Sequence, residues 1–169
     1  SPVGGYAVEI KTAATQSTVK GTVSLNQALI DAGEQLTFSE GGKTLNFETI
    51  AGESVETTMN RLEKAVIASG MDVVMVRIPG SAATPDAPQF LSFKHNEFGS
   101  EHFFQVASST SGVLSAQADV SDKIQNGDDV SGYIGGELGI GNGQVLTGSR
   151  PSKVSGLKIR YTGEKAPPP

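Results

Sequence analysis

Glycine spacing is the feature that most restricts how this chain can fold. The sequence contains 21 glycines. A dense run of them occupies positions 132, 135, 136, 139, 141, 143, 148 and 156. Glycine inside a helix costs about 0.5–1 kcal/mol relative to alanine, and the intervals here are too short for a helix. The second half of the chain is therefore predicted to be nearly all β, with short strands joined by tight turns.

A hairpin is the clearest element of the first half. Residues 35–40 (QLTFSE) and 43–48 (KTLNFE) flank Gly41-Gly42, a pair suited to a two-residue turn. The expected register pairs Glu40 with Lys43 at the turn and places the apolar residues on one face. Those apolar residues are Leu36, Phe38, Leu45 and Phe47.

The hydrophobic period changes after Gly52, where a helix is expected. One apolar stripe contains Val55, Met59, Leu62 and Val66. Ser54 is the expected N-cap, and Gly70 is the expected C′ residue. Residues 72–78 follow as a strand ended by Pro79. The expected fold class is thus α+β, mostly β, with a hairpin–helix–strand unit at about 35–78 before the β-rich subdomain.

Further strands are expected at both ends of the chain. Residues 6–12 alternate with Tyr6, Val8 and Ile10 inward, and residues 18–23 form a weaker strand. A helical turn is expected within 25–33, closed by Gly33. Strands at 90–95 and 102–107 are separated by an apparent hairpin connection, and the last strand at 156–162 has Leu157, Ile159 and Tyr161 inward.

Composition places the domain boundaries in a proline-rich loop. The predicted division is an α+β subdomain at 1–78, a loop at 79–89, a β-rich subdomain at 90–163 and a tail at 164–169. The 169 residues suit one domain or two small subdomains.

Cysteine content and charge exclude several classes of protein. The chain has no cysteine, which excludes disulfide scaffolds, cysteine-ligated metal sites and thiol nucleophiles. Its net charge of −5 offers no basic surface for nucleic acid or anionic lipid. No apolar run is long enough to cross a membrane. The absence of tryptophan, with only three tyrosines, argues against an aromatic platform for sugars.

One segment contains residue types that could bind a metal. His95, Glu97, Glu101 and His102 fall within eight positions and are the candidate zinc ligands. Their spacing is not H-E-x-x-H, and the segment resembles a connection between strands rather than a helix. A solvated turn is therefore the favoured interpretation, and no catalytic, cofactor or metal site is predicted.

Three other patterns are interpreted as structural. Residues 17–20 match S-x-x-K, but they lie in an expected strand and the companion motifs of penicillin-recognising enzymes are absent. The run at 135–143 lacks the helix and lysine of a phosphate-binding loop, so tight β-turns are expected. An acidic stretch could hold a weak calcium ion, but it lacks EF-hand spacing and is expected to be solvated surface. Its members are Asp119, Asp122, Asp128 and Asp129.

Several segments together resemble a family of bacterial flagellar proteins. Residues 36–47, followed by a helix, are similar to a short repeat in the outer domains of flagellins and of the filament cap protein (hook-associated protein 2). Residues 126–137, 143–148 and 156–163 resemble the tract "DVxGTINGExAxGxGQxLTG…GLxVxYTG" of the same proteins. The opening strand at 6–10 also resembles theirs.

The resemblance implies the central, hypervariable outer domain of a flagellin or cap protein. It implies a structural, non-catalytic role in the filament exterior and motility, no cofactor, and an extracellular location on the bacterial flagellum. The expected partners are other flagellar subunits, bound through regions outside this chain, with no nucleic acid or membrane. A flagellin is weakly preferred over a cap protein, since the variable region of the cap is usually longer.

Two other hypotheses remain open: a β-rich adhesin or carbohydrate-binding module, and a metal-dependent hydrolase that uses the His95–His102 segment.

Overall fold

The structure, a computed structural model, describes residues 5–77 and 83–168. Ile78 and Pro79, with which the expected strand at 72–78 ends, lie outside the described residues. The chain forms two compact units. Unit 1 comprises Ser1–Ser17, Glu97–His102 and Asn126–Pro169, and unit 2 comprises Thr18–Asn96 and Phe103–Gln125. These units differ from the sequence-based division at 78 and 89, because strand pairing joins stretches that composition along the chain cannot relate.

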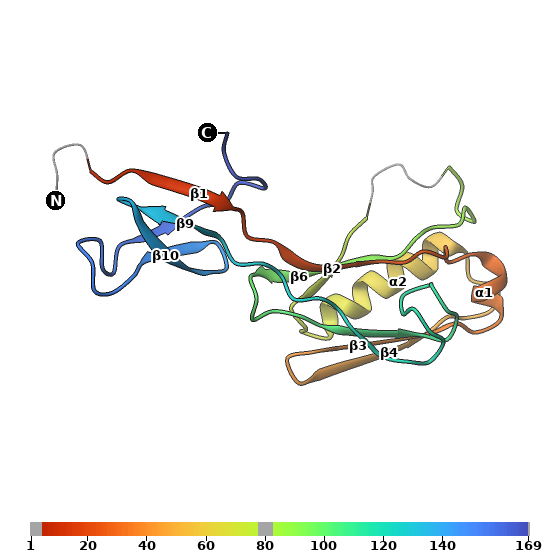
Figure 1. Ribbon diagram of the computed structural model, residues 1–169. Coiled ribbons are helices and arrows are strands. Elements are labelled where there is room, and N and C mark those ends of the chain that lie inside the picture. The colour runs from red at the N-terminus through yellow and green to blue at the C-terminus, as the bar shows by residue number, and fades with distance from the viewer. Residues whose placement is uncertain (1–4, 78–82, 169) are drawn as a thin grey trace. The chain divides into compact units, whose positions relative to one another are not determined.

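The fold is α+β and mostly β, as the sequence predicts (Figure 1). Its helices are α1 (Gln27–Asp31) and α2 (Val55–Ala68). Its strands are β1 (Val8–Thr12), β2 (Gln16–Lys20), β3 (Gln35–Glu40), β4 (Lys43–Glu48), β5 (Val73–Met75), β6 (Ser92–Phe98), β7 (Gln105–Ser108), β8 (Asp122–Lys123), β9 (Ser131–Ile134), β10 (Glu137–Asn142), β11 (Val145–Gly148) and β12 (Lys158–Arg160).

Unit 2 packs helix α2 against strands of two sheets. One sheet has the order β2-β6-β5 and the other the order β4-β3-β7-β8. Helix α2 contacts β5 of the first sheet and β4 of the second. The rings of Phe38 and Phe93 meet edge to face, with centroids 4.8 Å apart, and so join the two sheets within the core.

The predicted hairpin and helix of unit 2 are confirmed. Strands β3 and β4 pair in the expected register, with Glu40 opposite Lys43 and Leu36 opposite Phe47. The side chain of Ser54 accepts a hydrogen bond from the Thr57 backbone N–H and caps α2. All four residues of the predicted apolar stripe are buried. Gly70 has a φ of 72° just beyond the helix, where a left-handed residue is required.

Unit 1 is a five-stranded antiparallel sheet with the order β1-β9-β10-β11-β12. Gly135 and Gly136, both with positive φ, form the turn between β9 and β10, as the glycine pattern predicts. Gly132 lies where β1 and β9 approach closely, and a Cβ there would lie 2.1 Å from the Glu9 carbonyl oxygen. A small core covers one face of the sheet. It contains Ile10, Ala14, Val130, Ile134, Leu146 and Val154.

Three sequence expectations about strands are wrong in detail. β6 continues to Phe98, and β6 and β7 belong to different sheets, so 96–101 is not a hairpin connection. Val8 and Leu157 were expected inward but are 42% and 41% exposed. Alternation alone misplaced them, because Val8 is the first residue of β1 and Leu157 precedes β12, so both lie outside the small core of the unit. Among the described residues, the strand expected at 72–78 contains only β5.

Candidate functional site

The four candidate metal ligands are divided between the two units. His95 lies on β6 in unit 2 and is only 1% exposed, so the solvated turn expected there is wrong for this residue. Its Nε2 atom lies 3.1 Å from Glu40 Oε2. Glu97, Glu101 and His102 belong to unit 1. Over residues 5–77 and 83–168, no three His, Cys, Asp or Glu side chains are grouped as metal ligands. The absence of a metal site remains a prediction. The buried His95 ring has the partly buried Glu40 carboxylate as a partner.

Glu40 links three segments of unit 2. One carboxylate oxygen faces His95, and the other accepts a hydrogen bond of 2.8 Å from the Asp72 backbone N–H. Burial alone would raise the pKa of Glu40. The Asp72 N–H, the His95 ring and the Lys43 charge outweigh burial and hold that pKa below its ordinary value. The ionised carboxylate therefore fastens the end of β3 to β6 and to the start of β5.

Asp129 has a comparable role in unit 1. It accepts hydrogen bonds from the Ser100 backbone N–H at 3.0 Å, from Ser100 Oγ at 2.5 Å and from the Gly143 N–H at 2.8 Å. Burial opposes ionisation, but these hydrogen bonds and the nearby His102 lower the pKa of Asp129. A Cβ at Gly99 would lie 2.6 Å from Asp129 Oδ1, so glycine is needed for this approach. This carboxylate therefore joins segments of the unit and is not part of an open acidic surface.

Asp122 also accepts a backbone hydrogen bond, from the Ala116 N–H at 2.6 Å. Two of the four acidic residues singled out in the sequence thus stabilise loops. Asp119 has a φ of 60°, and the Asp128 N–H donates to Thr15 Oγ1 at 2.8 Å. Both aspartates are exposed, as expected for solvated surface.

The S-x-x-K match is a chance match, because it lies in strand β2. Residues three apart in a strand point to opposite faces. Ser17 is buried, while Lys20 is exposed. The lysine therefore cannot activate the hydroxyl as a nucleophile.

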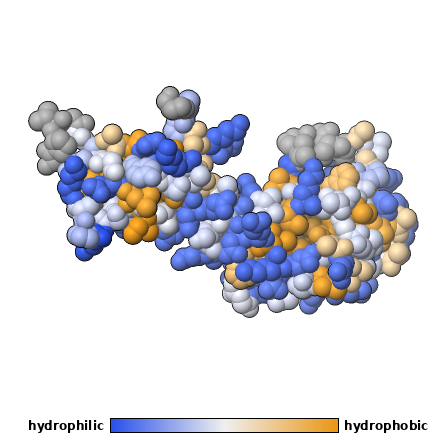
Figure 2. Space-filling view, viewed as in Figure 1, coloured by the Kyte–Doolittle hydropathy of each residue, from blue (hydrophilic) through white to orange (hydrophobic). Residues whose placement is uncertain are grey.

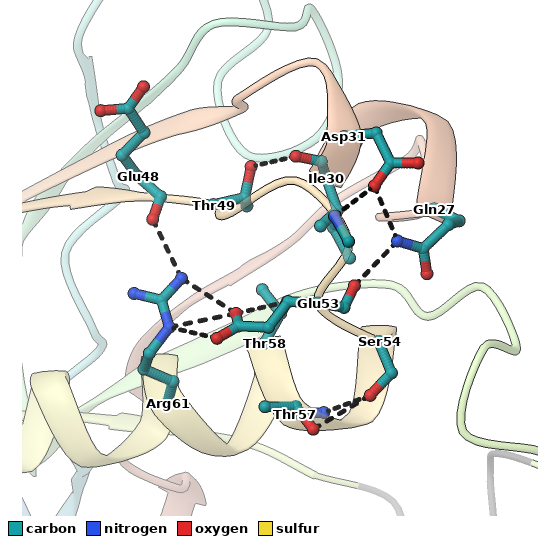
Figure 3. A network of polar contacts seen from close by, with 11 residues as sticks. Gln27, Ile30, Asp31, Glu48, Thr49, Glu53, Ser54, Thr57, Thr58 and Arg61 are labelled. Atoms are coloured by element: carbon teal, nitrogen blue, oxygen red, sulfur yellow. Dashed lines mark hydrogen bonds and ion pairs between the residues drawn. The ribbon is translucent and has the colours of Figure 1, made fainter.

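A network of polar contacts fixes the start of α2 in unit 2 (Figure 3). Arg61 Nε lies 3.1 and 3.2 Å from the two oxygens of Glu53, and Arg61 Nη2 donates to the Glu48 carbonyl at 3.0 Å. Asp31 accepts hydrogen bonds from the Gly52 N–H and from Gln27, which lower its pKa in that order of importance. These contacts join α1, the end of β4 and the first turns of α2.

An exposed apolar patch lies on the uncovered face of the sheet in unit 1. Leu138 and Ile140 on β10 are each 62% exposed. The space-filling view shows apolar side chains on the surface of both units (Figure 2). The register places Leu138 beside Tyr133 and Ile140 beside Thr147 on this face. A hollow of about 520 Å³ follows β1 and β9, where Lys11 Nζ lies 2.8 Å from Glu9 Oε1. The hollow therefore has a carboxylate beside its lysine.

A cavity of about 310 Å³ lies within unit 2. Met59, Val76 and Phe90 contribute apolar walls, and Lys20 and Arg77 contribute positive charge. Sequence reasoning missed this cavity and the His95–Glu40 pair, because both bring together residues far apart in the chain. Phe90 was expected to begin the strand at 90–95, and no local pattern marked it as a wall of a cavity.

The described part of the chain contains no helix long and apolar enough to cross a bilayer. No family model matches the sequence, and no curated protein matches it.

The fold is similar to that of flagellar cap proteins. The flagellar cap protein FliD D2-D3 domains from Serratia marcescens are 13% identical, with a TM-score of 0.55 over 97% of this chain and 91% of that chain. The corresponding Escherichia coli domains are 12% identical, with a TM-score of 0.55 over 94% and 84% of the two chains. FliD from Bdellovibrio bacteriovorus is 14% identical, with a TM-score of 0.51 over 96% and 87%.

Proposed function

We propose that this chain is the outer region of a bacterial flagellar cap protein, with a structural and non-catalytic role outside the cell. The observation that carries the proposal is the shared fold, which extends over 97% of this chain and 91% of the cap D2-D3 structure from Serratia marcescens. The tract at 126–163 supports it independently, because its sequence resembles the outer domains of flagellins and cap proteins.

A cap protein is favoured over a flagellin in this proposal. The sequence preferred a flagellin on length alone, whereas the solved structures compared above are of cap proteins. The polar groups considered for chemistry support a structural role, since Asp129 accepts three hydrogen bonds and His95 contacts Glu40. The proposed partners are other flagellar subunits, bound through regions outside this chain. A role in motility follows from that assembly.

Immunogold electron microscopy of the source cells tests the proposal. Antibodies raised against this chain are expected to label the tips of flagellar filaments. Labelling along the whole filament would assign the chain to a flagellin instead. Labelling of the cell body or of other appendages would overturn the flagellar role and favour the β-rich adhesin or carbohydrate-binding module. A strain lacking the gene is the control for antibody specificity, and its swimming tests the role in motility.

A further inference from the structure

The unit 2 cavity has a backbone framework that holds its walls in place. Strand β6 and the residues before it form one side. The Gly21 N–H donates to the Leu91 carbonyl at 2.8 Å, and the Val76 N–H donates to the Ser92 carbonyl at 2.8 Å. Leu25 and Gln89 exchange two further hydrogen bonds, of 2.8 and 3.0 Å. The cavity is therefore formed before any ligand binds, as small-molecule sites generally are.

The walls of the cavity favour a flat apolar group. Phe90 is 52% exposed although it is a large aromatic residue, and it lines the cavity together with Val76 and the largely buried Met59. An exposed phenyl ring offers a stacking surface for another ring. The volume of about 310 Å³ lies at the lower end of the range for small-molecule sites, so the ligand is small.

The charges of the cavity favour an anion with a single negative charge. Lys20 Nζ lies 5.9 Å from the centre of the Phe90 ring, and among the described residues no carboxylate lies within 4 Å of it. Arg77 Nη1 donates to Asn60 Oδ1 at 2.6 Å and lies 3.4 Å from Glu63 Oε1, so its charge is partly neutralised. Lys20 and Arg77 together therefore leave about one positive charge for a ligand to balance. A carboxylate, with one negative charge, suits this better than a doubly charged phosphate.

We propose that this cavity binds a small aromatic carboxylate. The ring of the ligand packs against Phe90 and Met59, and the carboxylate lies on the Lys20 and Arg77 side. The hollow in unit 1 is a poorer site for an anion because Glu9 already pairs with Lys11. This inference does not depend on the proposed flagellar role, which immunogold labelling tests separately.

An NMR titration of the whole chain with indole-3-acetate tests the proposal. Indole-3-acetamide has the same ring and no charge, and tryptamine has the opposite charge. Indole-3-acetate is expected to bind with saturation below about 10 mM and at least about fivefold more tightly than the amide. The affected amide signals are expected at Val76, Phe90 and Ser92, and added salt is expected to weaken binding.

Three variants locate the site. Lys20→Gln is expected to weaken indole-3-acetate binding about two- to fivefold and to leave the amide unchanged. Phe90→Ala is expected to weaken both, and its circular dichroism spectrum checks that the exposed substitution leaves the fold intact. Lys64→Gln, on an exposed position of α2, is the matched control and is expected to change nothing. Equal binding of the acetate and the amide, absence of saturation, or unchanged binding in Lys20→Gln would each overturn the proposal.

Discussion

The contacts between Arg61 and Glu53 are expected to supply a measurable part of the stability of unit 2. The guanidinium lies against both carboxylate oxygens, donates to the Glu48 carbonyl and stacks 4.3 Å from the centre of the Phe47 ring. The Glu53 side chain is 18% exposed, so solvent screens this pair less than it screens a surface pair. Glu53 also accepts a hydrogen bond from Thr58 at 3.1 Å, which holds the carboxylate in position.

The size of the effect follows from these contacts. A hydrogen bond to a charged group contributes about 1.5–3 kcal/mol, and contacts within one network are not additive. Arg61→Ala is therefore expected to lower the free energy of unfolding by about 2–3 kcal/mol. Arg61→Lys keeps the charge but loses the planar fork, and a loss of about half that size is expected. The coupling energy between Arg61→Ala and Glu53→Gln is expected to be about 1–2 kcal/mol.

During urea unfolding, the two units can be followed by separate spectroscopic probes. Both helices of the described residues, α1 and α2, belong to unit 2, so circular dichroism at 222 nm reports on that unit. All three tyrosines (Tyr6, Tyr133 and Tyr161) belong to unit 1, and the chain has no tryptophan, so tyrosine fluorescence reports on unit 1. With a urea m-value of about 2 kcal/mol/M, Arg61→Ala is expected to shift the helical transition by about 1 M.

Lys64→Ala is the matched control, since Lys64 is an exposed basic residue on the same helix. It is expected to change the free energy of unfolding by less than about 0.5 kcal/mol. A coupling energy below about 0.5 kcal/mol in the double-mutant cycle would refute the reasoning. In that case the two side chains would stabilise unit 2 independently, and their measured costs would simply add.

Three other changes test the packing and the electrostatics. Leu62→Ala removes a fully buried side chain from α2 and is expected to cost about 3 kcal/mol in the helical transition, whereas Ile67→Ala, at a 69% exposed position, is expected to cost little. Gly132→Ala places a methyl group 2.1 Å from the Glu9 carbonyl, so the tyrosine-detected transition is expected to fall; an unchanged midpoint would contradict this. The lowered pKa of Glu40 means that its stabilisation is present above about pH 4.5 and is lost as the pH falls through the lower pKa of the folded state. Melting temperatures between pH 7 and about pH 3 are expected to fall less steeply for Glu40→Gln, and equal slopes would contradict this.

Elements determined by local chemistry could be predicted from the sequence. The hairpin followed from the Gly41-Gly42 turn and the matching apolar faces, and α2 followed from its stripe, its Ser54 cap and Gly70. These signals lie within a few residues of the elements they specify. The interpretation of 96–101 as a hairpin failed because neighbouring strands were assumed to pair, whereas β6 and β7 enter different sheets.

The candidate sites were harder to predict, since they depend on long-range contacts. His95 was grouped with Glu97 and His102 by proximity in the sequence, yet the partner shown for its Nε2 atom is Glu40, on β3. Similarly, Asp129 was assigned to an acidic surface, although Ser100 and Gly143 enclose its carboxylate. No local pattern marks either pairing. Only the sheet topology brings these residues together.

Unit 1 is built from three separate stretches of the chain, and this affects the order in which the two units can fold. Strand β1 pairs with β9, so Val8 cannot form its pairing until Ile134 has been synthesised. Every segment of unit 2, in contrast, lies between residues 18 and 125. A chain that emerges gradually from its N-terminus can therefore complete unit 2 first, while β1 is still unpaired. Closing the β1–β9 contact requires a long loop, which slows folding unless the intervening residues are already compact. Early folding of unit 2 shortens the effective length of that loop, so it is expected to speed the pairing of β1 with β9.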